Sequence, residues 1–288
     1  MRLSVYLFFA VFLSFSCQPE FDIEQNDFSS AMTAWGYFNP DSTFIVYLSG
    51  AQPAWADYAH IGIENALVVV FEGGIPIDTL VEISEGKYQS AVDKYPSVGK
   101  VYHITVTHMD YPSLLTEPDT IPAIPDFSEI YTSVTPIPGN DAGQVLAAIG
   151  GLVNNRAGYD YIGSRVVFSD DGDEAFFAPP EGASCQPNLP VIDNIYYADY
   201  TCRREPTTDY LITSSNYKPV DLTAAEVSIC FPSRATIALG KQLERFNELN
   251  TGIYSVNPFF EPIYLPGNVY GGYGFVGGYS CKKVNVQF

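Results

Sequence analysis

The stretch Ala66-Leu67-Val68-Val69-Val70-Phe71 is an uninterrupted apolar run, and Glu72-Gly73-Gly74 ends it. A short run rich in β-branched residues and closed by glycines is typical of a strand that is buried inside a fold. Further strand-like segments, bounded by turn residues, surround this run at 32–38, 43–49, 77–84, 86–90 and 100–108. The pattern predicts a β-sandwich over residues 28–110.

Prolines recur through residues 111–143. Because proline fixes φ and lacks an amide donor, it disfavours both helices and sheet interiors. We therefore expect a semi-rigid connector here, in which Phe127, Ile130 and Tyr131 lie on one edge strand beside a neighbouring sheet.

The remaining residues, 144–288, again alternate in the manner of strands and are rich in aromatic side chains. One helix is predicted over residues 233–251, because Ser233 can cap it and Gly252 can end it. Between these two, apolar residues recur at helical spacing, at Ala235, Leu239, Leu243, Phe246 and Leu249. The expected fold class is mainly β, with a sandwich followed by a second β-rich domain that carries one C-terminal helix.

Composition narrows the range of functions. The chain has 33 Asp and Glu against 14 Lys and Arg, a formal net charge of −19, and 15% aromatic residues. This aromatic content argues against extended disorder, and an acidic surface repels phosphate backbones. Nucleic-acid binding is therefore not expected.

The N-terminus has the plan of a secretory signal. Arg2 precedes the apolar run Leu3–Phe15, which is too short to span a bilayer. The sequence Leu13-Ser14-Phe15-Ser16-Cys17 resembles a lipobox, at which a signal peptidase cleaves and the cysteine is acylated. We expect a signal peptide over residues 1–16 and a lipid-anchored linker over 17–27; the alternative is an ordinary signal peptide with a coincidental cysteine.

Acidic residues follow the expected lipidation site. The segment Gln18-Pro19-Glu20-Phe21-Asp22-Ile23-Glu24 resembles the signal that sends Bacteroidota lipoproteins to the outer face of the outer membrane. A solvated linker of the same composition is the alternative. The expected location is the outer membrane, with the protein lipid-anchored and facing the cell exterior.

Besides Cys17, the chain has four cysteines, all in its second half: Cys185, Cys202, Cys230 and Cys281. A secreted chain with an even number of remaining cysteines is expected to form disulfides. Of the three possible connectivities we favour Cys185–Cys202 with Cys230–Cys281, because the first pair closes the shortest loop. Zinc ligation is the competing interpretation, and it is disfavoured because no CxxC spacing occurs.

Two sequence motifs resemble ligand-binding sites, but each is better explained as a turn between strands. Residues 272–277, Gly-Tyr-Gly-Phe-Val-Gly, satisfy GxGxxG, but no acidic residue follows at the spacing a dinucleotide site needs. We expect tight turns or bulges in a terminal strand pair instead. The second motif offers carboxylates that could bind Ca²⁺ or form a hairpin tip, and we favour the tip: Asp170, Asp171, Asp173 and Glu174. No cofactor or metal is predicted.

The sequence carries no recognisable catalytic signature. The histidines are His60, His103 and His108, and the last two stand at odd separation on one predicted strand, so they point to opposite faces. No GxSxG, HExxH or P-loop occurs. The sequence therefore predicts no enzyme, although a hydrolase built on paired carboxylates is kept as a third interpretation.

Aromatic side chains are the main candidates for a binding surface, because they combine apolar area with a polar edge. Core packing is the alternative for each. The first group comprises Trp35, Trp55, Tyr196, Tyr197 and Tyr200. The second group lies on a glycine-rich segment that lets a backbone approach a partner closely, and its members are the interface candidates: Tyr264, Tyr270, Tyr273, Phe275 and Tyr279.

Several segments together resemble one family. The predicted helix is followed by Asn257-Pro258-Phe259-Phe260-Glu261-Pro262 and then by the glycine-rich residues 268–279, while 65–70 and 99–102 extend the resemblance backwards. These segments resemble an uncharacterised family of Bacteroidota lipoproteins, domain of unknown function 4249. The resemblance implies an outer-membrane lipoprotein with an immunoglobulin-like N-terminal module, commonly encoded beside SusC-type TonB-dependent receptors. It implies no activity and no catalytic residues.

Anchor, composition and resemblance lead to one expected function. We expect a surface-exposed, non-enzymatic lipoprotein that serves as an accessory subunit of an outer-membrane β-barrel. The barrel would be a SusC-like TonB-dependent transporter or part of a larger barrel complex, and the acylated Cys17 would hold the protein to the bilayer. The alternative is a free-standing module that binds glycan or peptide through exposed aromatics.

Overall fold

A computed structural model describes residues 31–51, 61–91, 93–136, 144–154, 161–168, 174–175, 191–192, 195–199, 209–219, 223–251 and 267–288. The strands are β1 (Met32–Phe38), β2 (Ile45–Gly50), β3 (Leu67–Glu72), β4 (Ile75–Ser84), β5 (Lys87–Gln89), β6 (Val101–Thr107), β7 (Leu114–Thr116), β8 (Asp119–Thr120), β9 (Asp126–Pro136), β10 (Gln144–Asn154), β11 (Tyr161–Phe168), β12 (Glu174–Ala175), β13 (Val191–Ile192), β14 (Ile195–Asp199), β15 (Asp209–Pro219), β16 (Ala224–Pro232), β17 (Val269–Tyr270) and β18 (Tyr273–Gln287).

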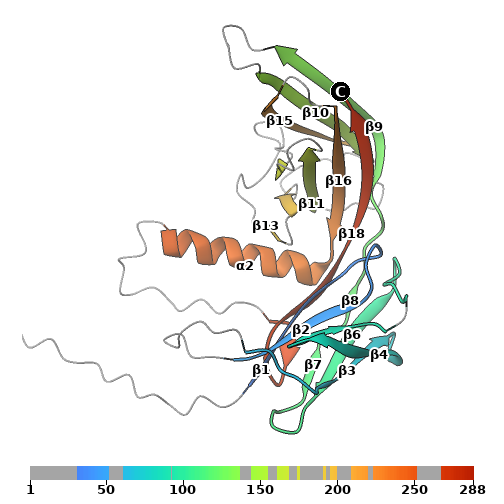
Figure 1. Cartoon of the computed structure of the whole chain (residues 1–288), viewed down its shortest axis with the longest axis vertical. Coiled ribbons are helices and arrows are strands. Elements are labelled where there is room, and N and C mark those ends of the chain that lie inside the picture. The colour runs from blue at the N-terminus through green and yellow to red at the C-terminus, as the bar shows by residue number, and fades with distance from the viewer. Residues whose placement is uncertain are drawn as a thin grey trace, which may run out of the picture.

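Most of these strands belong to one mixed sheet. Its order is β13-β14-β11-β16-β18-β1-β2-β5-β4-β3-β6-β7-β17, with β12 beside β11 and β8 beside β6. The sheet curls into an open half-barrel, in which the long curved β18 runs between the two halves of the molecule (Figure 1). A separate three-stranded sheet has the order β15-β10-β9. The chain is therefore mainly β, as expected.

The expected sandwich of two separate sheets over residues 28–110 is not shown by the described strands. The physical reason lies in β4, which is shared between two neighbours. Its first part pairs with β3 and its last part pairs with β5. Hydrogen bonding therefore continues around the core without a break, and the apolar sides of β1, β2, β3 and β6 enclose one cluster that includes Met32, Val46, Val70 and Ile104.

The C-terminal strand β18 joins the two ends of the chain. Its first residues pair in parallel with β1, and its remaining residues pair antiparallel with β16. Because side chains alternate along a strand, β18 contributes to different clusters on its two faces. Val276 lies in the cluster of the first half, Val286 lies in a second cluster with β11 and β16, and Tyr279 packs on the other face against a third cluster, which contains Tyr197 and Cys230.

The predicted C-terminal helix is confirmed as α2 (Arg234–Thr251), the one helix among the described residues. Ser233 precedes it, and the Ser233 Oγ accepts a hydrogen bond from the Thr236 amide at 3.2 Å. This is the expected N-terminal cap. Thr236 and Leu239 are buried where the helix packs against β18. No helix in the described part of the chain is both long and apolar enough to cross a membrane.

The proline-rich residues 111–143 contain three strands, β7, β8 and β9. The short β7 and β8 both pair with β6, in the large sheet. The third, β9, is an edge strand of the three-stranded sheet, where β10 is its one partner among the described strands. The predicted edge strand around Ile130 and Tyr131 is thus confirmed.

Candidate functional site

Three exposed aromatic side chains lie on the same face of three adjacent strands of the large sheet, the face opposite the core of the first half. We call Trp35, Tyr47 and Tyr273 the aromatic row. Trp35 on β1 stands directly opposite Tyr47 on β2, and Tyr273 on β18 stands opposite Thr33 on β1. Their exposed fractions are 36% for Trp35, 42% for Tyr47 and 57% for Tyr273. The row is therefore a solvent-facing aromatic surface that runs across three adjacent strands.

A lysine completes the row on its far side. Lys87 on β5 is the register partner of Tyr47, and the Lys87 Nζ lies 5.6 Å from the centre of the Tyr47 ring. An ammonium at this distance is attracted to the face of an aromatic ring. The surface thus combines exposed rings with the Lys87 ammonium at its border.

Buried rings hold Trp35 in place. The Phe275 ring lies 5.8 Å from the Trp35 ring and 5.7 Å from the Tyr37 ring, measured between centroids. Trp35 and Tyr37 also make an edge contact, and Tyr37 contacts Tyr279. Because Phe275 stands directly opposite Trp35 on β18 and is only 2% exposed, it packs beside Trp35 and does not belong to the exposed surface.

The alternation of β1 creates this arrangement. Met32, Ala34 and Phe38 are buried in the core, whereas Trp35 and Tyr37 point to the other face. Strand β18 can come close to β1 because Gly274 has φ +108°, and a Cβ at that position would lie 2.0 Å from the Ala34 carbonyl oxygen. A glycine is required there both for its backbone conformation and for space.

A groove lies at the start of α2. It has a volume of about 840 Å³ and is lined by residues of the β7–β8 segment, the first turns of the helix, Tyr161 and Asn268. The lining combines prolines and alanines with the charged residues Glu117, Asp119 and Arg234. A cavity of this size and mixed lining is suited to a small ligand.

Asp119 is the most perturbed group of this groove. The Asp119 Oδ2 accepts a hydrogen bond from the Gly278 amide at 3.0 Å. Burial raises the pKa of the Asp119 carboxyl, and hydrogen bonds from Ser233, Gly278, Thr120 and Ala235 oppose that increase. The carboxylate therefore joins β8, β18 and the first turn of α2, which is a structural role.

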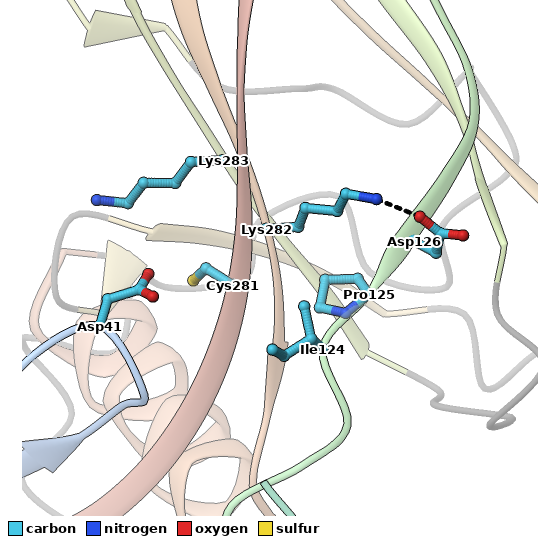
Figure 2. A pocket seen from close by; sticks show the side chains of 7 residues that line it. All are labelled: Asp41, Ile124, Pro125, Asp126, Cys281, Lys282 and Lys283. Atoms are coloured by element: carbon cyan, nitrogen blue, oxygen red, sulfur yellow. Dashed lines mark hydrogen bonds and ion pairs between the residues drawn. The ribbon is translucent and has the colours of Figure 1, made fainter. Parts of the chain in front are cut away.

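A second depression of about 590 Å³ lies beside the C-terminal part of β18 (Figure 2). Lys282 points to one side of the strand and pairs with Asp126, whereas Lys283 points to the side on which Asp41 lies. The depression also touches Cys281, Ile124 and Pro125. The ion pair with Asp126 engages the Lys282 ammonium within this depression.

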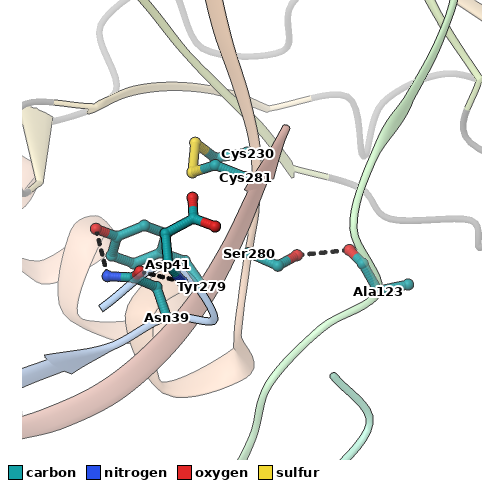
Figure 3. Close-up of a disulfide and its surroundings, with 7 residues drawn as sticks. All are labelled: Asn39, Asp41, Ala123, Cys230, Tyr279, Ser280 and Cys281. Carbon is teal, nitrogen blue, oxygen red and sulfur yellow. Dashed lines mark hydrogen bonds between the residues drawn. A yellow bond between two sulfur atoms is a disulfide. The ribbon is translucent and has the colours of Figure 1, made fainter. Parts of the chain in front are cut away.

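The predicted disulfide between Cys230 and Cys281 is confirmed (Figure 3). The two cysteines stand directly opposite each other on β16 and β18. Next to the disulfide, the Tyr279 hydroxyl accepts a hydrogen bond from Asn39 Nδ2 at 3.1 Å, and the Ser280 hydroxyl donates to the Ala123 carbonyl at 2.6 Å. The partner pair Cys185–Cys202 lies outside the described residues.

The structure divides the predicted interface candidates. Tyr273 is in the aromatic row, Phe275 is buried beside Trp35, and Tyr279 packs beside the disulfide. Tyr270 stands opposite Leu115 on β7, on the far side of the first-half core. One candidate, Tyr264, lies outside the described residues, as do Cys17, Trp55, Tyr200, His60 and the acidic residues Asp170, Asp171 and Asp173.

Other predicted residues have separate places. Tyr197 is buried with Tyr161, and only the backbone of Tyr196 and Glu174 is described. His103 stacks on Phe71, while the His108 Nε2 lies 3.1 Å from the Glu64 carbonyl oxygen, so the two histidines share no site. Within the described residues, no three potential metal ligands come together.

Sequence reasoning did not single out Tyr47, Lys87 or Asp119. The alternation of β2 was visible, with Val46 and Leu48 flanking Tyr47. The sequence pattern does not show which strands are neighbours, and only the pairing of β1, β2 and β5 brings Tyr47 between Trp35 and Lys87.

Comparison with known proteins identifies a family. The family described as Domain of unknown function (DUF4249) matches residues 18–231. The match covers well over half of the chain and ends in β16, before α2 and β18. A comparison with curated proteins found no match.

Proposed function

The chain belongs to the DUF4249 family, and from that premise we propose that it is a non-enzymatic, lipid-anchored accessory subunit of an outer-membrane β-barrel. The proposed partner is a SusC-like TonB-dependent transporter or a larger barrel complex. Acylation of Cys17 would tether the protein to the outer membrane, on the side facing the cell exterior. The acidic segment 18–24 supports this side.

The observation that carries docking is an exposed apolar surface near one end of the large sheet. We call Leu67, Leu115 and Tyr270 the edge patch. Tyr270 stands opposite Leu115, which stands opposite Thr105, and the register continues to β3, so the three side chains share one face. All three are exposed. Apolar groups gathered in this way mark a surface that another protein can cover.

The edge patch also has the polar border typical of protein interfaces. The Tyr270 hydroxyl donates a hydrogen bond to the Glu117 carboxylate, which raises the pKa of the tyrosine. The opposite faces of the same strands carry Val68, Ile104 and Leu114, which are buried in the core. The patch is thus a firm surface on a packed module. Tethering near a barrel raises the effective concentration, so a weak interface of this kind is sufficient.

Co-purification tests the proposal. The acylated full chain, tagged and extracted from gently solubilised membranes, should emerge with a β-barrel protein. A photo-crosslinking residue at Leu115 should give a covalent adduct with that barrel. The same residue at Val134, which is exposed on β9, is the matched control and should give none. Recovery of the tagged protein without any barrel would contradict the proposal.

A second candidate function, a free-standing module for glycan or peptide, is supported by the groove at the start of α2. Its volume of about 840 Å³ is suitable for part of such a ligand, and Arg234 supplies hydrogen-bond donors. Binding on a glycan array or a peptide library that is lost in Arg234→Ala would favour this function. Unchanged binding in that variant would exclude the groove as the site.

A further inference from the structure

We propose that the aromatic row is a lipid contact, which rests in the headgroup region of the bilayer to which Cys17 is tethered and so orients the protein on the membrane. The inference rests on the proposed function, because it requires the acylated Cys17. It adds a second attachment point, made by folded side chains, to the covalent lipid.

The chemistry of the row suits a membrane interface. Tryptophan and tyrosine combine an apolar ring with a polar group, and they concentrate where headgroups meet acyl chains. Trp35, Tyr47 and Tyr273 present such rings on one outward face. A single folded surface therefore offers several interfacial anchors together.

The distribution of charge selects this face. The chain carries 33 acidic residues, yet the four adjacent strands β18, β1, β2 and β5 contain none. The next strand, β4, already carries Asp78 and Glu82. Anionic headgroups repel a body with this net charge, but they do not repel the acid-free strands, and Lys87 adds an attraction.

The expected tether enters the fold at the same place. About fourteen peptide units separate Cys17 from Ala31, and at about 3.5 Å each they span at most about 50 Å. Trp35 follows only four residues after Ala31, on β1, the strand at which the described chain begins. A tether that ends at β1 limits the distance between the start of β1 and the lipid surface to about 50 Å, so the face of β1 can reach the bilayer.

The edge patch does not fit the same role. It lies on the far side of the core from the aromatic row, since Leu114 and Met32 are both buried between them. Its border contains Glu117, which accepts a hydrogen bond from Tyr270. An acidic border opposes contact with anionic lipid, so the two exposed surfaces serve different partners.

Fluorescence quenching tests the inference. The chain has two tryptophans, so Trp55→Phe leaves Trp35 as the sole reporter. The acylated full chain of this variant would be reconstituted into vesicles of phosphatidylethanolamine and phosphatidylglycerol, with and without brominated acyl chains. We expect bromine to remove most of the Trp35 emission and the remaining emission to be blue-shifted relative to the detergent-free soluble chain.

A second reporter provides the control. In the triple variant Trp35→Phe, Trp55→Phe, Tyr131→Trp the only tryptophan stands on β9, at a position that is exposed in the wild type. Its emission should be the same in brominated and unbrominated vesicles. Equal quenching of both reporters would overturn the inference, because it would show a general collapse of the protein onto lipid.

Mass spectrometry of the same samples separates the possible failures. An unmodified Cys17 thiol would contradict both the proposed function and this inference. An acylated Cys17 with unquenched Trp35 emission would overturn the lipid contact alone and leave barrel docking intact. The lipid contact would likewise be overturned if a soluble glycan or a co-purified barrel, and not lipid, shielded the Trp35 ring from solvent.

Discussion

Cys230 on β16 and Cys281 on β18 stand directly opposite each other and are joined by a disulfide. The bond lies midway along the strand that connects the two halves of the molecule, since β18 pairs with β1 before this point and with β16 around and after it. It therefore fastens the C-terminal strand to its neighbour at the place where its two sets of pairing meet.

Removing the disulfide should lower stability. The bond closes a loop with a sequence separation of 51 residues, and loss of such a cross-link costs about 2–4 kcal/mol, mainly through the unfolded chain. The double variant Cys230→Ala, Cys281→Ala avoids a free thiol. Denaturant unfolding should show a lower midpoint, and reduced wild type should behave similarly. A midpoint equal to that of the oxidised wild type would contradict the prediction.

Replacing Gly274 should separate β18 from β1. In Gly274→Ala the side chain meets the Ala34 carbonyl oxygen at 2.0 Å and the backbone stays at positive φ. We expect a loss of about 2 kcal/mol or more in unfolding free energy. Gly73→Ala is the matched control, since Gly73 also has positive φ but nothing within 4 Å, and it should cost about 1 kcal/mol. Similar losses in both variants would show that contact with β1 is unimportant.

Asp119 should make stability depend on pH. Burial raises its folded pKa above the ordinary 3.8, so the folded protein holds this proton more tightly than the unfolded chain. The stability gained from this bound proton is fully present below pH 3.8 and is lost as the pH rises through the folded pKa of Asp119. The unfolding free energy of wild type, relative to that of Asp119→Asn, should therefore increase as the pH falls from 7 to 4. A pH-independent difference would refute this.

His103 should act in the opposite direction. Burial lowers its pKa below the ordinary 6.5, so the unfolded chain takes up the proton first. The stability contributed by neutral His103 is therefore fully present above pH 6.5 and is lost as the pH falls through the folded pKa. His103→Phe keeps the stacking on Phe71 without a titrating group. Between pH 7 and pH 5, the thermal unfolding midpoint of this variant should fall less than that of wild type. An equal fall in both proteins would contradict the prediction that His103 titrates in this range.

Local patterns were sufficient for most elements of secondary structure. The apolar run at 66–71 corresponds to β3 (Leu67–Glu72), shifted by one residue, and the helix predicted at 233–251 is α2. These predictions succeeded because side-chain periodicity and caps act over a few residues. The sandwich prediction was less successful, because nothing local shows that β4 divides its hydrogen bonds between β3 and β5.

The candidate surface was only partly predictable. Trp35 and Tyr273 were suspected as aromatic binding residues, but the sequence placed Tyr270 and Phe275 with them. The two-residue turn between β17 and β18 separates Tyr270 from Tyr273, and Phe275 is buried where it packs against the rings of Trp35 and Tyr37. Burial and facing depend on neighbours that are distant in sequence.

By itself, the sequence determined the strand-rich composition, the helix with its cap, the acidic charge and the cysteines available for pairing, because each of these is local or additive. Only the tertiary structure decided that β18 lies parallel to β1 and brings Tyr273 opposite Thr33, on the face that also carries Trp35. That pairing joins segments about 240 residues apart, and its register depends on core packing and on the close approach allowed at Gly274, which no short stretch of sequence contains.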